Sequence, residues 1–476
     1  MSPPALFWFR QDLRLADNPG LDSLGDRPAL LVHVLDDSAA REHALGGAQR
    51  WWLHCSLAAL DAALRARGSA LHLARGDATR IIPKLADEIG AEEVIAGRLY
   101  EPWARRRDEA VAHTLEKAGR KLVLHTHSLL HEPHRLRTGA GRPYSVYTPF
   151  SRAIFALGEP HPPIPAPKRL TPVAHPPRGE SLDALGLLPP GPDWWRGFSA
   201  SWTPGETGAA ERMEAFGKCA IDRYEEDRNT PRIEGTSRLS PHLRFGEISP
   251  RQAWHAAREA GLKGEAGFLK ELIWREFSYH TLWHRPELPE QPLRAEYARF
   301  PWMASRPALR AWQRGLTGYP IVDAGMRQLW RTGWMHNRVR MVAASFLVKH
   351  LLQPWQQGEA WFWDTLVDGD LASNAANWQW VAGSGADAAP YFRVFNPVLQ
   401  GRKFDAGGAY VRRWVPELAK LPDRHIHSPW EAPAEVLSRA GVTLGRDYPR
   451  PIIGHAEGRA RALAAHAALR AEEAAA

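Results

Sequence analysis

The chain has 476 residues, of which 44% are hydrophobic and 24% are charged, so it has the composition of a globular protein with room for two or three cores. No run of about eighteen apolar residues occurs, which excludes a membrane-spanning helix. The only cysteines, Cys55 and Cys219, are too few for a cysteine-rich metal site and indicate a reduced, cytoplasmic protein. The net charge of +8 permits a polyanionic partner such as DNA, and 21 tryptophans exceed what core packing demands.

The N-terminal part alternates short apolar strands with helices. Strands are predicted at 5–9, 29–35, 70–74, 93–96 and 122–125, and helices near 47–67, 78–89 and 103–119. Such alternation predicts βαβ units and a parallel, Rossmann-like sheet, so residues 1–130 are expected to form an α/β domain. Arg10-Gln11-Asp12-Leu13-Arg14 follows the first strand in place of a glycine-rich fingerprint, so nothing indicates dinucleotide binding there.

Four histidines follow the last of these strands, at His125, His127, His131 and His134. Zinc binding is one interpretation, but the spacing matches no known zinc motif. We favour histidines at a strand end and in a loop, and we expect no metal.

A Pro/Gly-rich linker is expected at 131–204, followed by a helical domain at 205–476. Helical periodicity appears near 205–226, 249–260, 265–284, 306–315, 320–331, 334–353 and 357–367. No alternating β-pattern competes with it, so this half is predicted to be all-α. The tail at 455–476 is predicted to be a helix or a frayed end.

The stretch from Asp368 to Trp380 holds two carboxylates, two asparagines and two tryptophans within thirteen residues. Asp-Gly-Asp is usually a turn, and Trp-x-Trp usually spans a strand or packs at a helix end. The alternative is a ligand site, where carboxylates accept hydrogen bonds and indoles stack on a planar group or pass electrons.

Three further segments combine polar and aromatic residues. Thr236, Ser237 and Ser240 offer hydroxyls near a predicted helix start, which suits a phosphate group but also suits a simple N-cap before Pro241. On a helix, Glu271 shares a face with Trp274 and Arg275, either beside a ligand or as a surface ion pair. In the segment 334–341, Asn337 and Met341 share one face of a predicted helix. Arg340 in the same segment is a basic residue that could pair with the carboxylates of the stretch from Asp368 to Trp380.

Six motifs in order resemble the photolyase/cryptochrome family, and most closely class I cyclobutane pyrimidine dimer (CPD) photolyases. They are Phe7–Arg14, Gly235–Pro241, Glu271–Phe277, Gly318–Ala324, Trp334–Met341 and Asp368–Trp380. The resemblance runs from about residue 5 to about residue 430. It implies an N-terminal α/β domain, a long linker and a helical domain that holds FAD in a bent form.

The resemblance also implies roles for individual residues. The FAD contacts would be Tyr224, Thr236, Ser237, Arg238, Leu239, Ser240, Phe268, Arg340, Asp368, Gly369, Asp370 and Asn374. Asp368 would pair with Arg340, and Asn374 would lie beside flavin N5, where an uncharged amide suits a fully reduced, anionic flavin. The catalytic set would comprise the electron-transfer residues Trp378, Trp355 and Trp302, together with Asn374 and Glu271. The lesion pocket would comprise Glu271, Trp274, Asn337, Met341 and Trp380, and the other DNA contacts would be Arg228, Arg338 and Gln400.

We therefore expect a light-dependent DNA repair lyase, in which FADH⁻ donates a photoexcited electron to split CPDs. We expect a cytoplasmic monomer that acts on UV-damaged, double-stranded DNA. Trp103-Ala104 stand where folate-binding relatives often have Asn-Glu, so 8-hydroxydeazaflavin or flavin is favoured over folate as a second, antenna chromophore. Two alternatives are a cryptochrome photoreceptor and a light-independent nucleic-acid-binding protein whose tryptophans are only core.

Overall fold

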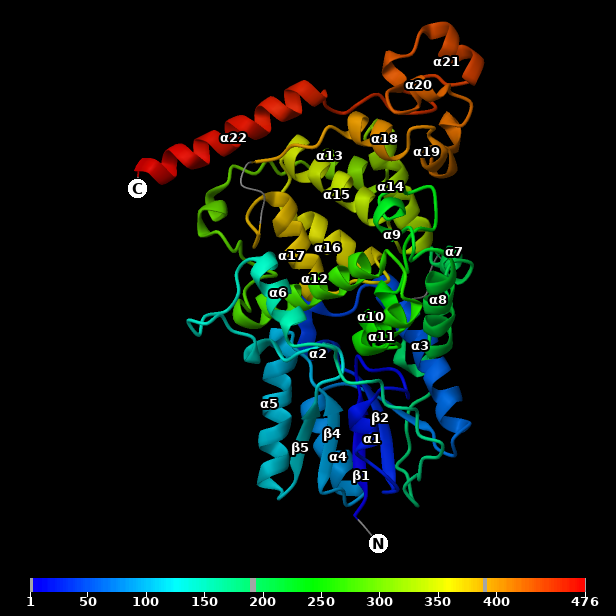
Figure 1. The fold of residues 1–476 in the computed structure, drawn as a ribbon, viewed down its shortest axis with the longest axis vertical. Helices are drawn as coiled ribbons and strands as arrows, with labels where there is room; N and C mark the ends of the chain where they lie inside the picture. Colours follow the sequence, from blue (N-terminus) through cyan, green and yellow to red (C-terminus); the bar gives the residue numbers. More distant parts are fainter. Residues whose placement is uncertain (1–2, 189–193, 388–391, 476) are drawn as a thin grey trace.

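The computed structural model describes residues 3–188, 194–387 and 392–475. The N-terminal part is a five-stranded parallel sheet in the order β3-β2-β1-β4-β5, as the strand–helix alternation predicts. Its strands are β1 (Ala5–Phe9), β2 (Ala29–Leu35), β3 (Leu71–Arg75), β4 (Glu93–Gly97) and β5 (Lys121–His125). Helices α3 (Gly47–Arg65), α4 (Ala78–Glu88) and α5 (Pro102–Lys117) flank it (Figure 1).

Every residue of β1 is buried, and its side chains divide between two cores. Phe7 and Phe9 join the cluster that includes α3, whereas Leu6 and Trp8 join the cluster that includes α4. This two-residue period is the pleat of a strand that is covered on both faces. The apolar run that predicted β1 is therefore the centre of the sheet.

The predicted linker has structure of its own. Within it, α6 (Tyr147–Ala156) packs against α12 (Glu265–His284) of the helical domain. After α6 the chain returns to the sheet, where the Ala29 amide donates to the Thr171 carbonyl and the Glu180 amide donates to the Leu73 carbonyl. The linker therefore runs along the β3 edge of the sheet. Residues 189–193 of the Pro-rich stretch lie outside the described residues.

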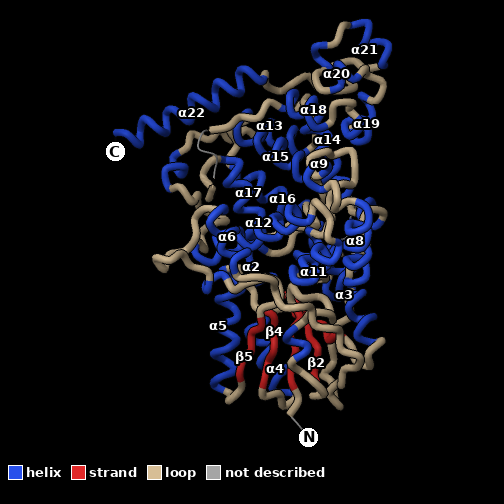
Figure 2. The backbone as a smooth tube through the Cα atoms, in the orientation of Figure 1, coloured by secondary structure: helices blue, strands red, loops and turns tan. Residues whose placement is uncertain are grey.

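The C-terminal half is helical, as expected (Figure 2). Its longer helices are α8 (Glu206–Cys219), α11 (Pro250–Ala260), α12, α13 (Arg306–Gln313), α14 (Pro320–Thr332), α15 (Asn337–Ser345), α16 (Trp355–Thr365), α17 (Leu371–Ala382), α18 (Pro397–Phe404) and α22 (His455–Ala475). Short helices α9 (Tyr224–Asp227), α10 (Ser240–Phe245), α19 (Ala409–Trp414), α20 (Asp423–Ile426) and α21 (Ala434–Ala440) connect them.

Two helical predictions need correction. The helix expected at 205–226 ends at Cys219, because the Ile221 amide closes back on the Phe216 carbonyl and turns Ile221 into the core. The helix expected at 334–353 begins only at Asn337, and a π-helical turn, Phe346–His350, follows its end at Ser345. The common interpretation of the stretch from Asp368 to Trp380 agrees with the structure, because Asp368 lies in a turn and Trp378 and Trp380 lie near the end of the helix α17.

The two parts of the chain meet around the loop that precedes α17. The Gln49 side-chain amide of α3 donates to the Trp363 carbonyl at 2.7 Å, and Arg244 Nε of α10 donates to the Gly369 carbonyl at 2.6 Å. Trp52 Nε1 of α3 donates to Glu247 at 2.9 Å. The sheet domain thus helps to fix the backbone at Trp363, whereas α10 of the helical half helps to fix it at Gly369.

A candidate cofactor and substrate cavity

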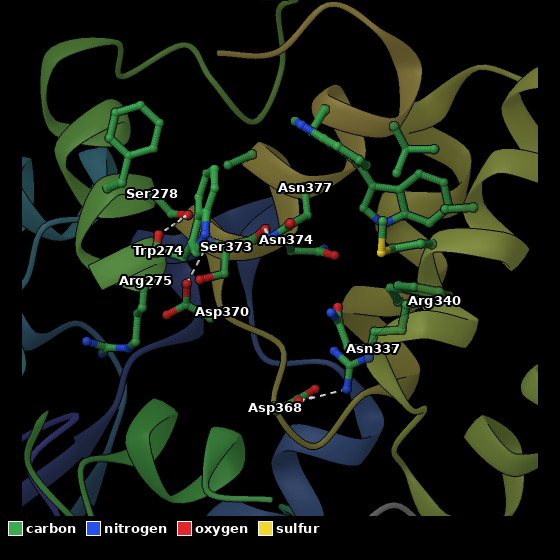
Figure 3. A pocket seen from close by; sticks show the side chains of 18 of the residues that line it. Trp274, Arg275, Ser278, Asn337, Arg340, Asp368, Asp370, Ser373, Asn374 and Asn377 are labelled. Atoms are coloured by element: carbon green, nitrogen blue, oxygen red, sulfur yellow. Dashed lines mark hydrogen bonds and ion pairs between the residues drawn. The ribbon is translucent and has the colours of Figure 1, made fainter. Parts of the chain in front are cut away.

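A cavity of about 410 Å³ opens between α12, α15, α16 and α17. That volume lies in the range of sites that enclose small ligands, roughly 300–1,000 Å³. Twelve of the residues singled out from the sequence line it: Arg228, Glu271, Trp274, Asn337, Arg340, Met341, Asp368, Gly369, Asp370, Asn374, Trp378 and Trp380. Residues more than 150 positions apart therefore meet in one space (Figure 3).

Asp368 is held by two helices. Its Oδ2 atom accepts from Arg340 Nη2 of α15 at 2.8 Å and from Ser240 Oγ of α10 at 2.6 Å, and Figure 3 shows the ion pair with Arg340. The pairing with Arg340 was expected. The other oxygen, Oδ1, is buried and has no hydrogen-bond partner among the described residues. Because a buried acceptor without a donor costs free energy, this oxygen is placed to accept from a bound molecule.

Asp370 combines the two interpretations of its motif. It is the N-cap of α17, where its Oδ1 accepts from the Ser373 amide at 2.7 Å. Its Oδ2 accepts from the Tyr279 hydroxyl of α12. Burial raises the pKa of Tyr279 well above its usual value, so the phenol stays a donor. Tyr279 was missed, although it follows the cavity-lining Arg275 by one helical turn.

Asn374 faces a buried carboxyl group that the sequence did not reveal. Its side-chain nitrogen donates to Glu359 Oε1 at 2.8 Å and to the Glu359 carbonyl at 3.1 Å. Both bonds are donated by the amide nitrogen, so the nitrogen points to α16. The amide oxygen takes part in neither bond. Burial raises the pKa of Glu359 to about 7, and the hydrogen bond from Asn374 opposes the rise.

The mouth of the cavity is aromatic on two sides. Trp274 of α12 and Trp380 of α17 both line it, together with the exposed Asn337 and the partly exposed Met341. One face of Trp274 is stacked on Tyr147 of α6, with ring centroids 3.5 Å apart and planes 2° apart. Tyr147 was missed because it lies in the segment interpreted as a linker. The stacking leaves the other face of Trp274 for the cavity.

Charges at the mouth are paired. Arg228 Nη1 lies 2.6 Å from Glu271 Oε1, and both side chains are about one-quarter to one-third exposed, at 26% and 33%. The Glu271 that was interpreted as a partner for Arg275 on the same helix therefore pairs with Arg228 instead. Arg275 Nη1 donates to the Ser128 carbonyl of the N-terminal part at 2.6 Å.

The structure does not bring every proposed FAD contact to the cavity wall. Tyr224, Leu239 and Phe268 are buried in a separate core cluster, where Phe268 packs edge-on against Tyr224. The helix α10 begins at Ser240 with Leu239 at its N-cap position, so the simple N-cap interpretation is wrong. Thr236, Ser237 and Arg238 are half-buried in the preceding loop, where Arg238 has a φ of 53° and lies over Trp202. Their contact with FAD stays a prediction.

The three tryptophans proposed to conduct electrons share one hydrophobic cluster. Trp378 and Trp355 are 2% exposed, and Trp302 packs on the same cluster with a larger exposed fraction. Trp378 also lines the cavity. The electron route through these three tryptophans stays a prediction.

Arg338 and Gln400 lie outside the cavity. Arg338 donates to Asn229 at 2.6 Å and its guanidinium lies over the Phe404 ring of α18, the helix that carries Gln400. The two residues therefore belong to one surface beside the mouth.

One of the four histidines at the end of β5 and after it, His127, makes a contact within the fold. His127 is buried and its Nε2 atom contacts the Gln11 carbonyl at 3.1 Å, while burial and two nearby arginines hold its pKa well below the usual value. Within residues 3–188, 194–387 and 392–475, no three metal-ligating side chains are grouped to hold an ion. In the same ranges, no helix is long and apolar enough to cross a membrane.

Comparison with known proteins places the chain in a family. Residues 5–168 match the family model of DNA photolyase, and residues 268–468 match that of the FAD-binding domain of DNA photolyase. The deoxyribodipyrimidine photo-lyase of Agrobacterium fabrum is 52% identical over 98% of both chains. Cryptochrome-1 of Arabidopsis thaliana is 37% identical over 96% of this chain and 69% of its own.

Solved structures agree with this assignment. The crystal structure of a bacterial class III photolyase from Agrobacterium tumefaciens superposes with a TM-score of 0.96 and 51% identity, covering 99% of this chain and 98% of that one. An archaeal photolyase from Sulfolobus tokodaii with two FAD molecules gives a TM-score of 0.83 and 29% identity, covering 98% and 99%. The class I subclass expected from the motifs stays a prediction, since the 51% identical structure is described as class III. The chain belongs to the DNA photolyase family and carries its FAD-binding domain.

Proposed function

We propose that this protein is a light-dependent DNA repair lyase that splits cyclobutane pyrimidine dimers in double-stranded DNA. The observation that carries the proposal is the shared cavity: the carboxylates and amide of the proposed cofactor site and the aromatic mouth line one space. A photoreceptor needs the first set of residues but has no need of a lesion-sized aromatic mouth beside it.

The residues present fit FAD. The buried Asp368 Oδ1 needs a donor, which a hydroxyl or ring N–H of the cofactor provides. Arg340, Asp370 and Asn374 stand beside it on the same wall. Bound FAD would supply light absorption and one-electron chemistry. The residues of the chain would hold the cofactor between α12, α15 and α17 and would keep water away from it.

The mouth suits a dimer that is flipped out of the duplex. Flipping costs a few kcal/mol, and less at a damaged step, because stacking there is already weakened. Trp274, held flat by Tyr147, and Trp380 provide apolar walls for the two fused rings. The Asn337 amide can donate to a base carbonyl, and the Glu271 carboxylate can accept from a base N–H.

Basic residues around the mouth provide the sequence-independent part of DNA binding. Arg228 is already oriented by Glu271, and Arg338 by Asn229. Contacts of such arginines with phosphates position the strand and make affinity depend on salt. Gln400, on the helix under Arg338, would extend the same surface.

The lesion preference rests on the absence of a proton donor at two positions. Neither Asn337 nor Met341, which line the cavity, titrates. The nearby His336 is 3% exposed, and its Nδ1 accepts from the Arg338 amide at 3.2 Å. Burial and neighbouring arginines lower its pKa to about 3, so it stays neutral. Reversal of a (6-4) photoproduct needs a proton donor, whereas splitting a cyclobutane ring needs only an electron and a carbonyl hydrogen bond.

The second chromophore would lie on the N-terminal domain. A cavity of about 90 Å³ lies at the carboxyl ends of β1 and β2, and Arg10, His33, Trp103 and Arg107 are among its lining. Trp103, the residue that departs from the folate-binding pattern, is therefore at this site. The space is small, so an 8-hydroxydeazaflavin or flavin would rest partly on the surface.

The test is a repair assay with reduced, FAD-loaded protein on duplexes that carry one CPD or one (6-4) product, in light and in the dark. We expect reversal of the CPD in light only. Light-dependent flavin changes without any repair would favour the cryptochrome-like alternative, which has support from the 37% identity to Cryptochrome-1. Purified protein without flavin absorption, equal activity in the dark, or repair of the (6-4) product would refute the proposal.

A further inference from the structure

A second, smaller cavity of about 70 Å³ lies next to the first, under the C-terminal helix α22. Trp380 and Val381 of α17 line both cavities, so they form the wall between them. The remaining walls come from the π-helical turn after α15, the segment 392–395 and one face of α22.

The floor of this second cavity is a buried lysine. Lys349, on the π-helical turn, is 2% exposed, and its Nζ donates to the Ala382 carbonyl at 2.7 Å. The Nζ atom also lies 3.1 Å from the centroid of the Phe392 ring. No described carboxylate lies within ion-pair distance of it. Burial removes water from the Lys349 ammonium group, and no negative charge nearby among the described residues compensates for this loss. Burial therefore holds the pKa of Lys349 well below its usual value.

The rim of the cavity adds two exposed arginines. Arg294 and Arg393 both line it, and neither makes an ion pair within the described residues. They differ in this from Arg228 and Arg340 in the first cavity, which pair with carboxylates at 2.6 and 2.8 Å. Among the residues that the structure describes, the lining contains no aspartate or glutamate. Arg294, Lys349 and Arg393 therefore bring three basic groups to the second cavity, and none of the three has an ion pair within the described residues.

We infer that this cavity binds a phosphoryl group, and that the group is a phosphodiester of the damaged strand next to the flipped dimer. A guanidinium pair at the rim and the Lys349 amino group below, whose protonation a bound anion would favour, match a small tetrahedral oxyanion, with the Ser345 hydroxyl as a further donor in the lining. The space is too small for a base with its sugar.

The position of the cavity favours the strand over a free anion. A strand whose dimer stacks on Trp380 has its next phosphates within reach of the other side of that ring. Burial, then Arg228 and then Arg393 lower the pKa of Arg338, so the positive charges at the mouth of the first cavity and at the rim of the second are near one another. This inference rests on the proposed function, since it requires a dimer in the first cavity.

The test combines removal of the charge of one DNA phosphate with removal of the charge of one protein side chain, and it asks whether the two changes affect binding independently. CPD duplexes are made with one methylphosphonate at each phosphate near the dimer in turn, and binding by FAD-loaded protein is measured in the dark. At one position we expect the methylphosphonate to weaken wild-type binding about tenfold, the range of a charge-assisted hydrogen bond. For Arg294→Gln and for Lys349→Met, we expect the same methylphosphonate to cause no loss of affinity relative to the unmodified duplex.

The control is Arg299→Gln, an exposed arginine at the end of the 3-10 helix Ala295–Arg299, whose N-cap residue is Arg294; Arg299 does not line the cavity. It should show the wild-type pattern. Arg294→Gln keeps the test valid if Lys349→Met fails to fold, because Arg294 is exposed. The phosphate site is refuted if every methylphosphonate weakens DNA binding by wild type and by Arg294→Gln to the same extent. The proposed function stands in that case, provided that both proteins still prefer the CPD duplex.

A phosphate titration of DNA-free protein, followed by ³¹P NMR, separates the two sources. Phosphate binding that Arg294→Gln abolishes, without any coupled position in the duplex, would assign the site to a free anion and overturn the strand assignment. Wild-type protein that binds damaged and undamaged duplex equally would instead refute the proposed function, and this inference with it.

Discussion

Replacing Glu359 by glutamine should make the protein more stable at alkaline pH. Burial raises the pKa of Glu359 from 4.5 to about 7, and at one pKa unit per roughly 1.4 kcal/mol this corresponds to about 3 kcal/mol. The folded state binds this proton more tightly than the unfolded state. Its stabilising contribution is therefore complete below about pH 4.5 and is lost as the pH rises to about 7. Glutamine does not titrate, yet its carbonyl still accepts from Asn374.

We expect Glu359→Gln to exceed wild type by up to about 3 kcal/mol at pH 8 and by less than about 1 kcal/mol at pH 5. Glu276, whose pKa burial also raises to about 7, remains in both proteins and cancels in the comparison. Urea unfolding of FAD-loaded protein, followed by circular dichroism from pH 5 to 8, gives the midpoints. The exposed Glu435→Gln on α21 is the control and should follow wild type. Parallel midpoint curves for Glu359→Gln and wild type would refute the buried-acid argument.

Four further variants test the site. Trp302→Phe should slow or abolish photoreduction with an external donor while chemically pre-reduced protein still repairs; wild-type photoreduction would contradict the electron route. Asn374→Asp places a second carboxyl beside Glu359, so we expect incomplete photoreduction of bound FAD by absorption spectroscopy and poor repair, and normal values for both would count against the role of the amide. Asp368→Asn breaks the ion pair with Arg340 and should weaken FAD retention at least about tenfold in a fluorescence titration; unchanged affinity would place the cofactor elsewhere. Tyr147→Ala removes the stacked support of Trp274 and should weaken binding of a CPD duplex by about two- to tenfold in the dark, whereas equal binding would show that Trp274 needs no support.

The sheet and most of the cavity were predictable from local sequence. The buried strands are continuous apolar runs, so β1 and β2 match their predicted bounds to the residue. The cavity residues are grouped in short motifs, and a motif that carries one wall residue often carries two, as with Glu271 and Trp274.

What the sequence did not reveal depends on contacts between distant elements. Tyr147 lies in a segment that looked like a linker, and only its packing on α12 shows that it supports Trp274. Glu359 looks like any surface acid on a helix until Asn374 is placed 2.8 Å away. Tyr224 and Phe268 were expected to contact FAD, but their aromatic rings lie in a core cluster and do not line the cavity.

The path of the linker along β3 bears on self-association. An open sheet has two edge strands, and an unpaired edge can recruit a strand from another copy and start aggregation. Here the Glu180 amide uses the Leu73 carbonyl of β3, and residues near Thr171 pair beside the start of β2. The tether between the two halves of the molecule thus also blocks part of one sheet edge. Cutting it should expose a surface for intermolecular strand pairing even where both halves stay folded.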